Sequence, residues 1–281
     1  HQAVVGRALA RARAEGRPAL VATFDPHPAK LFRPDAPPFA LTRLDQKLDL
    51  FAGFGIDATV VIPFNTALAA LTAQSFVGDW LHARIGAGVA VSGADFTFGT
   101  KRSGNTALLA ELGQGHGFAA EVVHAVSDSG GVISSTRIRE ALRDGEVAAA
   151  TALLTRPYSI RGEVQHGAKL GRTLGFPTAN MVLGAYLRPR SGVYAVRARL
   201  GDGSHVDGVA NLGIRPMIEP VVELLETFLF DWAGDLYGQT IDIELVEFLR
   251  PEWKLDGLDA LKAQIAVDSD NARAALARVA R

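Results

Sequence analysis

The sequence of 281 residues contains no cysteine, no excess of charge of either sign and no long apolar run. Without cysteine it has neither disulfide bonds nor metal sites built from thiolates. Its 29 basic and 30 acidic residues leave a formal net charge of −1, which gives no overall attraction to nucleic acid or to an anionic membrane. No apolar run approaches the about 18 residues of a membrane-spanning helix. We therefore expect a cytoplasmic protein without nucleic-acid or membrane partners. The possibility that it forms a homo-oligomer stays open.

The composition is that of a folded protein, with 48% hydrophobic and 21% charged residues. The length favours two domains, since a typical domain has about 100 to 200 residues. The pattern changes at Thr155-Arg156-Pro157, because proline cannot continue the Ala/Leu-rich helix before it. We therefore predict one domain over residues 1–155 and another over 156–281.

The first domain alternates strand-like and helix-like segments. Strands are predicted at 18–24, 58–64, 88–92 and 120–125, and helices at 42–54, 74–85 and 105–112. This order predicts a parallel α/β sheet, whose ligands bind beyond the carboxyl ends of the strands.

The second domain has short strands separated by glycine, at 193–200, 205–210, 221–230 and 239–248. This pattern predicts a small antiparallel β-barrel. Helical spacing follows at 253–267 and 271–279, with Asp268, Ser269 and Asp270 as candidate caps of the second helix.

A glycine-rich segment opens the second domain and is a candidate phosphate-binding loop. Glycine lets backbone N–H groups approach an oligophosphate, and basic side chains add charge. Tight barrel corners also use glycine, so the spacing alone leaves both interpretations open. The candidate residues are Gly162, Gly167, Lys169, Gly171, Arg172 and Gly175.

Three further residues are candidates for binding a metal ion and for accepting a proton during phosphate transfer. The Thr178 hydroxyl and the Asn180 carbonyl oxygen are hard ligands that suit the Mg²⁺ carried by ATP, although a polar turn would also explain them. Glu226 alternates with Leu224, Phe228 and Phe230, which predicts that it lies on a buried strand face. Burial raises the pKa of a carboxylate, which favours its accepting a proton from a hydroxyl. Alternatively, Glu226 is the partner of a buried arginine.

The motif from Gly171 to Asn180, Gly-Arg-x-Leu-Gly-Phe-Pro-Thr-Ala-Asn, resembles the signature of riboflavin kinases. Further motifs of that family follow in order at 192–194, 208–213, 226–232, 235–238 and 248–252, and Met217 and Phe228 depart from the usual pattern. The resemblance implies that Glu226 activates the ribityl 5′-hydroxyl for attack on the γ-phosphorus of ATP. It also implies flavin contacts at Asn211 and Arg250.

Three motifs of the first domain lie at predicted strand ends: Thr23-Phe-Asp-Pro-His-Pro28, Gly93-Ala-Asp-Phe-Thr-Phe-Gly99 and Ile133-Ser-Ser-Thr-Arg-Ile-Arg139. Taken alone, the first is a proline-bounded turn and the third a helix cap beside a basic turn. Together they resemble the FMN adenylyltransferase module of the prokaryotic bifunctional FAD synthetases. The resemblance implies that Ser134, Ser135, Thr136, Arg137 and Arg139 hold ATP phosphates, with Asp95 and Phe96 at the flavin.

The same family has a Gly-x-His-x-Gly-His motif near its start, of which His1 corresponds to the last histidine. His1 is therefore a candidate catalytic residue that binds ATP phosphate, although it would also fit a tag remnant.

The resemblance implies an enzyme that converts riboflavin to FMN and FMN to FAD, with ATP as co-substrate and Mg²⁺ in both steps. The fold implied is a Rossmann-like nucleotidylyltransferase domain followed by a small antiparallel β-barrel riboflavin kinase domain with C-terminal helices. One alternative is a monofunctional riboflavin kinase whose first domain is inactive. Another is a flavin-binding regulatory protein, which would need no base such as Glu226.

Overall fold

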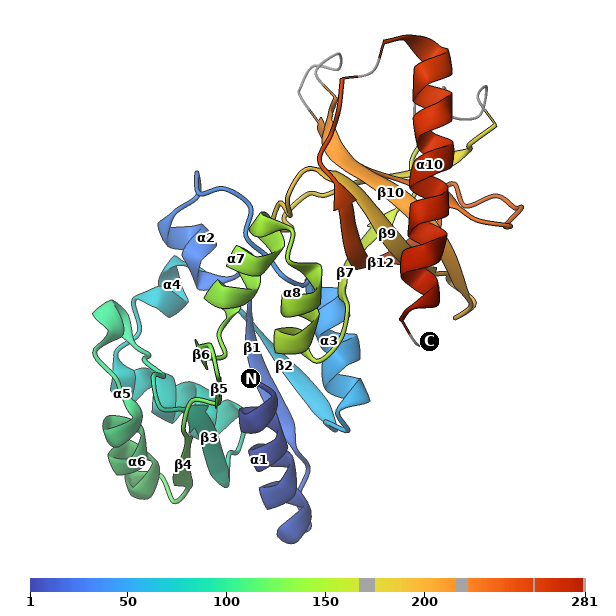
Figure 1. Cartoon of the computed structure of the whole chain (residues 1–281). Helices are drawn as coiled ribbons and strands as arrows, with labels where there is room; N and C mark the ends of the chain where they lie inside the picture. Colours follow the sequence, from blue (N-terminus) through green and yellow to red (C-terminus); the bar gives the residue numbers. More distant parts are fainter. Residues whose placement is uncertain (167–174, 216–221, 255, 280–281) are drawn as a thin grey trace. The chain divides into compact units, whose positions relative to one another are not determined.

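The computed structural model describes residues 1–166, 175–215, 222–254 and 256–279 (Figure 1). By their contacts these form two compact units, His1–Ala36 with Leu44–Ile133, and Pro37–Arg43 with Ser134–Arg281. Residues 134–155, expected in the first domain, thus pack with the second unit, while the domain boundary itself stays a prediction. Among the described residues, no helix has the length and apolar character needed to cross a membrane.

The first unit contains two pairs of parallel strands (Figure 1). Strand β1 (Leu20–Asp25) pairs with β2 (Ala58–Pro63), and β3 (Val89–Gly93) pairs with β4 (Ala119–Val123). All four predicted strands are present, but their hydrogen bonds form two separate pairs where a single sheet was expected. The short β5 (Ser127–Asp128) and β6 (Gly131–Val132) form an antiparallel pair.

Helices connect these strands and supply most of the remaining structure of the unit. The predicted helix at 74–85 is the short α5 followed by a π-helix, η1. The side chains of Asn65, Thr72 and Asn105 cap α4, α5 and α6. The helices are α1 (Gln2–Ala14), α2 (Pro28–Phe32), α3 (Leu44–Gly53), α4 (Thr66–Ala69), α5 (Ala73–Ser75), η1 (Phe76–Arg84), η2 (Thr100–Arg102) and α6 (Thr106–Gly115).

The second unit contains the predicted antiparallel barrel. Its six strands follow the order β7-β12-β9-β10-β11-β8, with every neighbouring pair antiparallel. The Gln165 N–H donates to the Asn180 carbonyl oxygen at 2.8 Å, which links the continuation of β7 to β8, the two outermost strands of that order. The strands are β7 (Tyr158–Glu163), β8 (Thr178–Val182), β9 (Gly192–Arg199), β10 (His205–Arg215), β11 (Val222–Leu229) and β12 (Thr240–Arg250).

Helices α7 (Ser135–Asp144) and α8 (Val147–Leu154) precede the barrel, and α10 (Gly257–Ala277) follows it. Helix α10 lies along β9, β10 and β12 (Figure 1). It is one continuous helix, so the prediction that Asp268, Ser269 and Asp270 cap a second helix is wrong. Asp268 and Ser269 are instead buried inside α10, where Asp268 binds Arg250 and the Ser269 hydroxyl donates to the Ile265 carbonyl oxygen.

The barrel is apolar on both faces of its strands. Inside lie large buried side chains such as Tyr158, Met181, Tyr194 and Leu225. Outside, a second cluster joins strand residues to α10, and it consists of Val193, Ala195, Val209, Phe230, Ala272, Ala275 and Leu276. Burial of this outer cluster fixes α10 against the sheet, since burying apolar area is the main driving force of packing.

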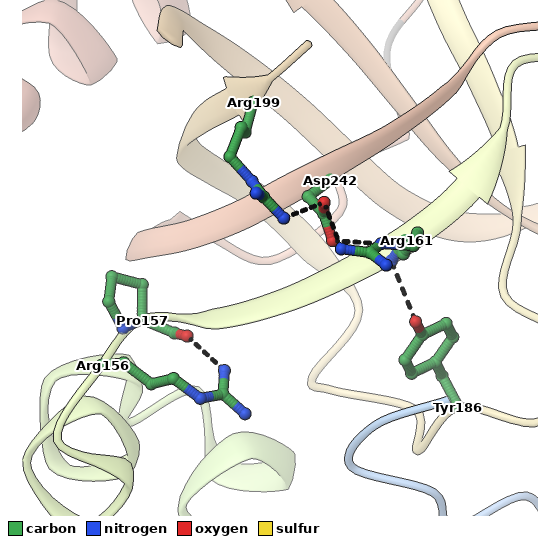
Figure 2. A network of polar contacts seen from close by, with 6 residues as sticks. All are labelled: Arg156, Pro157, Arg161, Tyr186, Arg199 and Asp242. Carbon is green, nitrogen blue, oxygen red and sulfur yellow. Dashed lines mark hydrogen bonds and ion pairs between the residues drawn. The ribbon is translucent and has the colours of Figure 1, made fainter. Parts of the chain in front are cut away.

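Charged side chains on β7, β12 and β9 form a network (Figure 2). Asp242 accepts from Arg161 Nε and Nη2 at 3.0 Å each and from Arg199 Nη2 at 2.7 Å. Asp242 is opposite both arginines in the strand register, and the side chains of Asp242 and Arg161 are only 10% and 12% exposed. The Arg161 backbone N–H also donates to the Tyr186 hydroxyl at 3.0 Å. The network therefore joins three neighbouring strands through one carboxylate.

We predict that Asp242→Asn lowers the free energy of unfolding of the barrel by about 3 to 5 kcal/mol, because it removes the carboxylate charge that faces the largely buried guanidinium of Arg161. The matched control is Asp231→Asn, which weakens the exposed Arg273–Asp231 pair and should cost far less, because exposed ion pairs are screened by solvent. Chemical denaturation followed by circular dichroism measures both. Equal losses in the two variants would contradict this account.

Candidate functional site

Three polar side chains lie in a row across adjacent strands of the barrel. Glu226 on β11 is opposite Asn180 on β8 and opposite Asn211 on β10. Directly opposed residues of antiparallel strands share a face, with Cβ atoms about 5 Å apart. The structure thus brings together a predicted catalytic, a predicted metal-binding and a predicted flavin-binding residue. We call Asn180, Glu226 and Asn211 the polar row.

Asn180 is 5% exposed, yet its Oδ1 atom has no hydrogen-bond partner among the described residues. Its Nδ2 atom donates to the Thr178 carbonyl oxygen at 3.2 Å. Thr178 lies two residues earlier on β8, so its side chain is on the same face as Asn180. A buried amide oxygen left without a donor is costly, and a hard cation would satisfy it. The donors present therefore fit Mg²⁺.

Glu226 is half-buried on the outer face of the barrel. The sequence predicted that Glu226 lies on the buried face of β11. The structure corrects this prediction, because the inner, buried face of β11 is formed by Leu225, Thr227 and Leu229. Phe228 and Phe230, on the same face as Glu226, are apolar because they join the cluster beneath α10. The carboxylate therefore lies at an accessible edge of the outer cluster.

Glu252 is a neighbour of the polar row that the sequence analysis did not select. The Asn211 Nδ2 atom donates to Glu252 Oε1 at 3.3 Å. Gly213, two residues beyond Asn211, leaves room for this carboxylate, since a Cβ atom there would lie 2.0 Å from Glu252 Oε1. The Arg-Pro-Glu motif at 250–252 was the signal that could have identified it.

Arg250, expected at the flavin, makes a structural ion pair. Its Nε and Nη2 atoms donate to the two carboxylate oxygens of Asp268 at 2.8 and 2.6 Å, and its guanidinium lies 4.5 Å from the centre of the Trp253 ring. Val193 on β9 is opposite both Arg250 on β12 and Asn211 on β10, so Arg250 and Asn211 are two strands apart at the same level of the sheet. Arg250 therefore fastens α10 to β12 near the polar row.

Only part of the glycine-rich segment can be described. Gly167, Lys169, Gly171 and Arg172 lie outside the described residues. Gly162 is in β7, where an added Cβ atom would lie 3.4 Å from the Met181 sulfur, an ordinary van der Waals contact, so packing inside the barrel does not by itself require glycine there. Gly175 has φ +89°, a left-handed conformation that favours glycine.

Next to this segment, the rings of His166 and Tyr237 are 3.8 Å apart between centroids. The two residues are far apart in the sequence, and their contact follows from the hydrogen bonds of Val164 with Gln239 and Gly238. No spacing in the sequence signals this pair.

The predicted cap at 134–139 is confirmed as a helix start. Ser134 caps α7 by accepting the Arg137 N–H at 3.3 Å, and Ser135 and Thr136 form the first turn. The Arg139 Nε atom donates to the Phe39 carbonyl oxygen at 2.9 Å, and burial lowers the pKa of this arginine. Arg139 thus ties α7 to the segment 37–43 of the same unit, and Arg137 remains near the helix start, where N–H groups favour anions.

The first unit holds the remaining candidates. Asp95 is exposed in the turn after β3, and Phe96 stacks on Phe98 with ring centroids 5.4 Å apart. His1 is exposed at the start of α1. A chain of aromatic contacts continues from Phe98 to Phe32, which is 66% exposed, and its members are Phe98, Phe76, Phe24, Phe64 and Phe32. Sequence analysis found Phe96 but not Phe32.

The chain matches two family models, one described as FAD synthetase at residues 1–137 and one described as riboflavin kinase at residues 154–276. It is 41% identical to the bifunctional riboflavin kinase/FMN adenylyltransferase of Escherichia coli K12, covering 97% of this chain and 87% of that protein. The identity to the protein of the same description from Bacillus subtilis is 37%, with 97% and 87% covered.

Among solved structures, a crystal structure described as a macrolide-efflux protein from Streptococcus pneumoniae has a TM-score of 0.86 and 31% identity. It covers 97% of this chain and 89% of that one. The likeness thus extends over both units.

Proposed function

The chain belongs to the family of bifunctional riboflavin kinase/FMN adenylyltransferases, and we propose that the polar row is the centre of its kinase reaction. The enzyme phosphorylates riboflavin to FMN with ATP and then adenylylates FMN to FAD with release of pyrophosphate. The observation that carries the proposal is the direct opposition of Asn180, Glu226 and Asn211 on three adjacent strands. The alternative of a kinase with an inactive first domain is not favoured, because the FAD synthetase model matches residues 1–137.

Glu226 is the proposed general base. Its carboxylate accepts the proton of the ribityl 5′-hydroxyl while that oxygen bonds to the γ-phosphorus of ATP, and the bond from the γ-phosphorus to the bridging oxygen of ADP breaks. The half-buried position supports this role, since the carboxylate is reachable by a substrate yet held by strand pairing. Asn211, one strand away, is proposed to bind the flavin, and Glu252 to orient Asn211 through the contact at 3.3 Å.

Thr178 and Asn180 are the proposed ligands of Mg²⁺. The unpartnered Oδ1 atom of Asn180 supports this assignment. When bound, the ion would neutralise the negative charge that spreads over the phosphate oxygens. Gly162, Gly167, Lys169, Gly171, Arg172 and Gly175 remain the proposed phosphate segment. Arg250 is proposed as a positioning residue of the flavin site, because its donors are engaged by Asp268.

For the adenylyl transfer we propose two groups of residues. Ser134, Ser135, Thr136, Arg137, Arg139 and His1 hold ATP phosphates, supported by the N–H groups at the start of α7. Asp95 and Phe96 hold the flavin, supported by the stacking of Phe96 on Phe98, from which the aromatic chain leads to the exposed Phe32. Since both reactions consume ATP, a cytoplasmic place of action is proposed as well.

Replacing Glu226 by Gln should lower the rate of FMN formation by about 10² to 10⁴, because the amide cannot accept the proton. The assay uses riboflavin and Mg-ATP and resolves the products by chromatography. Glu247→Gln, which changes an exposed carboxylate on β12, is the control and should keep the wild-type rate. A folded Glu226→Gln enzyme with near wild-type kinase turnover would refute the assignment of the base.

For Asn180→Ala we expect the Mg²⁺ concentration that half-saturates the kinase to rise by roughly tenfold or more, because one ligand oxygen is lost. Thr227→Val is the matched control, since Thr227 is equally buried on β11 but belongs to the inner face. An unchanged Mg²⁺ requirement in Asn180→Ala would exclude Asn180 as a ligand.

Phe96→Ala should raise the KM for FMN in FAD formation by about tenfold, corresponding to the loss of one aromatic stacking contact, and should leave FMN formation from riboflavin unchanged. Phe54→Ala, at an exposed aromatic residue of the same unit, serves as the control. Release of pyrophosphate with FMN and ATP measures the reaction. An unaltered KM would remove Phe96 from the flavin site.

A further inference from the structure

A cavity of about 490 Å³ lies between the outer face of the barrel and the C-terminal end of α10. Its walls come from β9, β10, the end of β11 and the last turns of α10, and the lining residues are Arg197, Asp207, Phe230, Arg273, Leu276, Ala277 and Val279. Cavities of this size hold small-molecule ligands in other proteins. The cavity is distinct from the polar row, because Asp207 and Asn211 are four residues apart along β10, about 13 Å.

Arg197 is the polar group at the floor of the cavity. It is 8% exposed, and its Nε atom donates to Asp207 Oδ1 at 2.8 Å. Among the described residues, its two terminal nitrogens have no acceptor. These nitrogens are not among the fully buried atoms that lack a partner, so they are accessible from the cavity, and the planar fork of arginine matches the two oxygens of a carboxylate. Arg197 thus offers paired donors to a ligand in the cavity.

Each arginine at the cavity is paired with a carboxylate. The cavity therefore has no large excess of positive charge, which limits the negative charge that a ligand can carry. Arg197 is paired with Asp207, and Arg273 with Asp231 at 2.7 and 3.1 Å. Opposite Arg197 in the register of β12 lies Glu244, whose pKa is raised by burial. A monoanion fits such surroundings better than a dianion, which would face uncompensated repulsion from these carboxylates.

The remaining walls are apolar. Phe230 and Leu276 are 4% and 3% exposed, and Val279 lies at the rim with 44% exposure. The Arg273 guanidinium lies 4.2 Å from the centre of the Phe230 ring, which holds this ring in place. An apolar body of a ligand would therefore contact Phe230 and Leu276 while its acid group meets Arg197.

We propose that this cavity is a second ligand site, which binds a small carboxylate carried on an apolar ring or chain, with Arg197 as the anchor. The site is distinct from the polar row, and its existence does not depend on the roles assigned to Glu226 or Asn180.

The test is isothermal titration of the full chain with benzoate, in the presence of saturating riboflavin and Mg-ADP so that the kinase site is occupied. We expect saturable binding of one benzoate per chain. Benzamide, its neutral analogue, should bind at least about tenfold more weakly, because charge-assisted hydrogen bonds are the stronger ones. Inorganic phosphate, which lacks an apolar body, should not compete.

Two variants on α10 locate the binding. Ala277→Trp fills the cavity from an exposed helical position and should weaken benzoate binding at least about tenfold through steric exclusion. Ala274→Trp, at an exposed position of the same helix outside the cavity lining, is the matched control and should bind like the wild type. Arg197→Met should also abolish binding, and the Ala277 variant keeps the test valid if the loss of Arg197 unfolds the barrel.

Absence of saturable benzoate binding would overturn the proposal. So would binding that Ala277→Trp leaves unchanged, or equal affinity for benzoate and benzamide. Competition by inorganic phosphate at similar concentrations would likewise contradict a site for an apolar carboxylate.

Discussion

Cross-strand pairing in the barrel fixes the distances between side chains that are far apart in the sequence. Because β8, β11 and β10 pair without interruption at Asn180, Glu226 and Asn211, these three residues share one face at neighbouring positions. A slip of one residue in any pair would turn Glu226 into the core and bring Leu225 or Thr227 to the outside. The proposed base, metal ligand and flavin contact therefore depend on the same register that closes the barrel.

Helix α10 covers the centre of the outer face of this sheet and leaves regions on either side of it accessible. Its apolar residues cover the centre of the face, and the Arg250–Asp268 pair fastens the helix beside the polar row. At its other end, the Arg273–Asp231 pair and the ring of Phe230 border the cavity that we propose for a carboxylate. One helix thus lies between the proposed catalytic edge and the proposed second binding region on the same strands.

Much of this could be predicted from the sequence, and the failures have physical causes. The alternation of strands and helices and the motif from Gly171 to Asn180 identified the two folds and the family, because these signals are local. The face of Glu226 was misassigned because both faces of β11 are apolar, one toward the core and one toward α10. Asp268 and Ser269 resembled caps, since the sequence does not reveal that Arg250 binds Asp268 inside one long helix. The pair His166–Tyr237 arises from tertiary pairing, which local patterns do not contain, whereas Glu252 stands in the Arg-Pro-Glu motif and only its contact with Asn211 depends on the fold.

The central claim is that the polar row is the kinase centre, and a crystal structure of the chain with riboflavin, Mg²⁺ and ADP tests it most directly. The account predicts the ion about 2.0 to 2.1 Å from Asn180 Oδ1 and the Thr178 hydroxyl oxygen. It also predicts the ribityl 5′-hydroxyl about 2.6 to 3.2 Å from the Glu226 carboxylate. An ion bound by other side chains, or a ribityl end directed away from Glu226, would contradict the account.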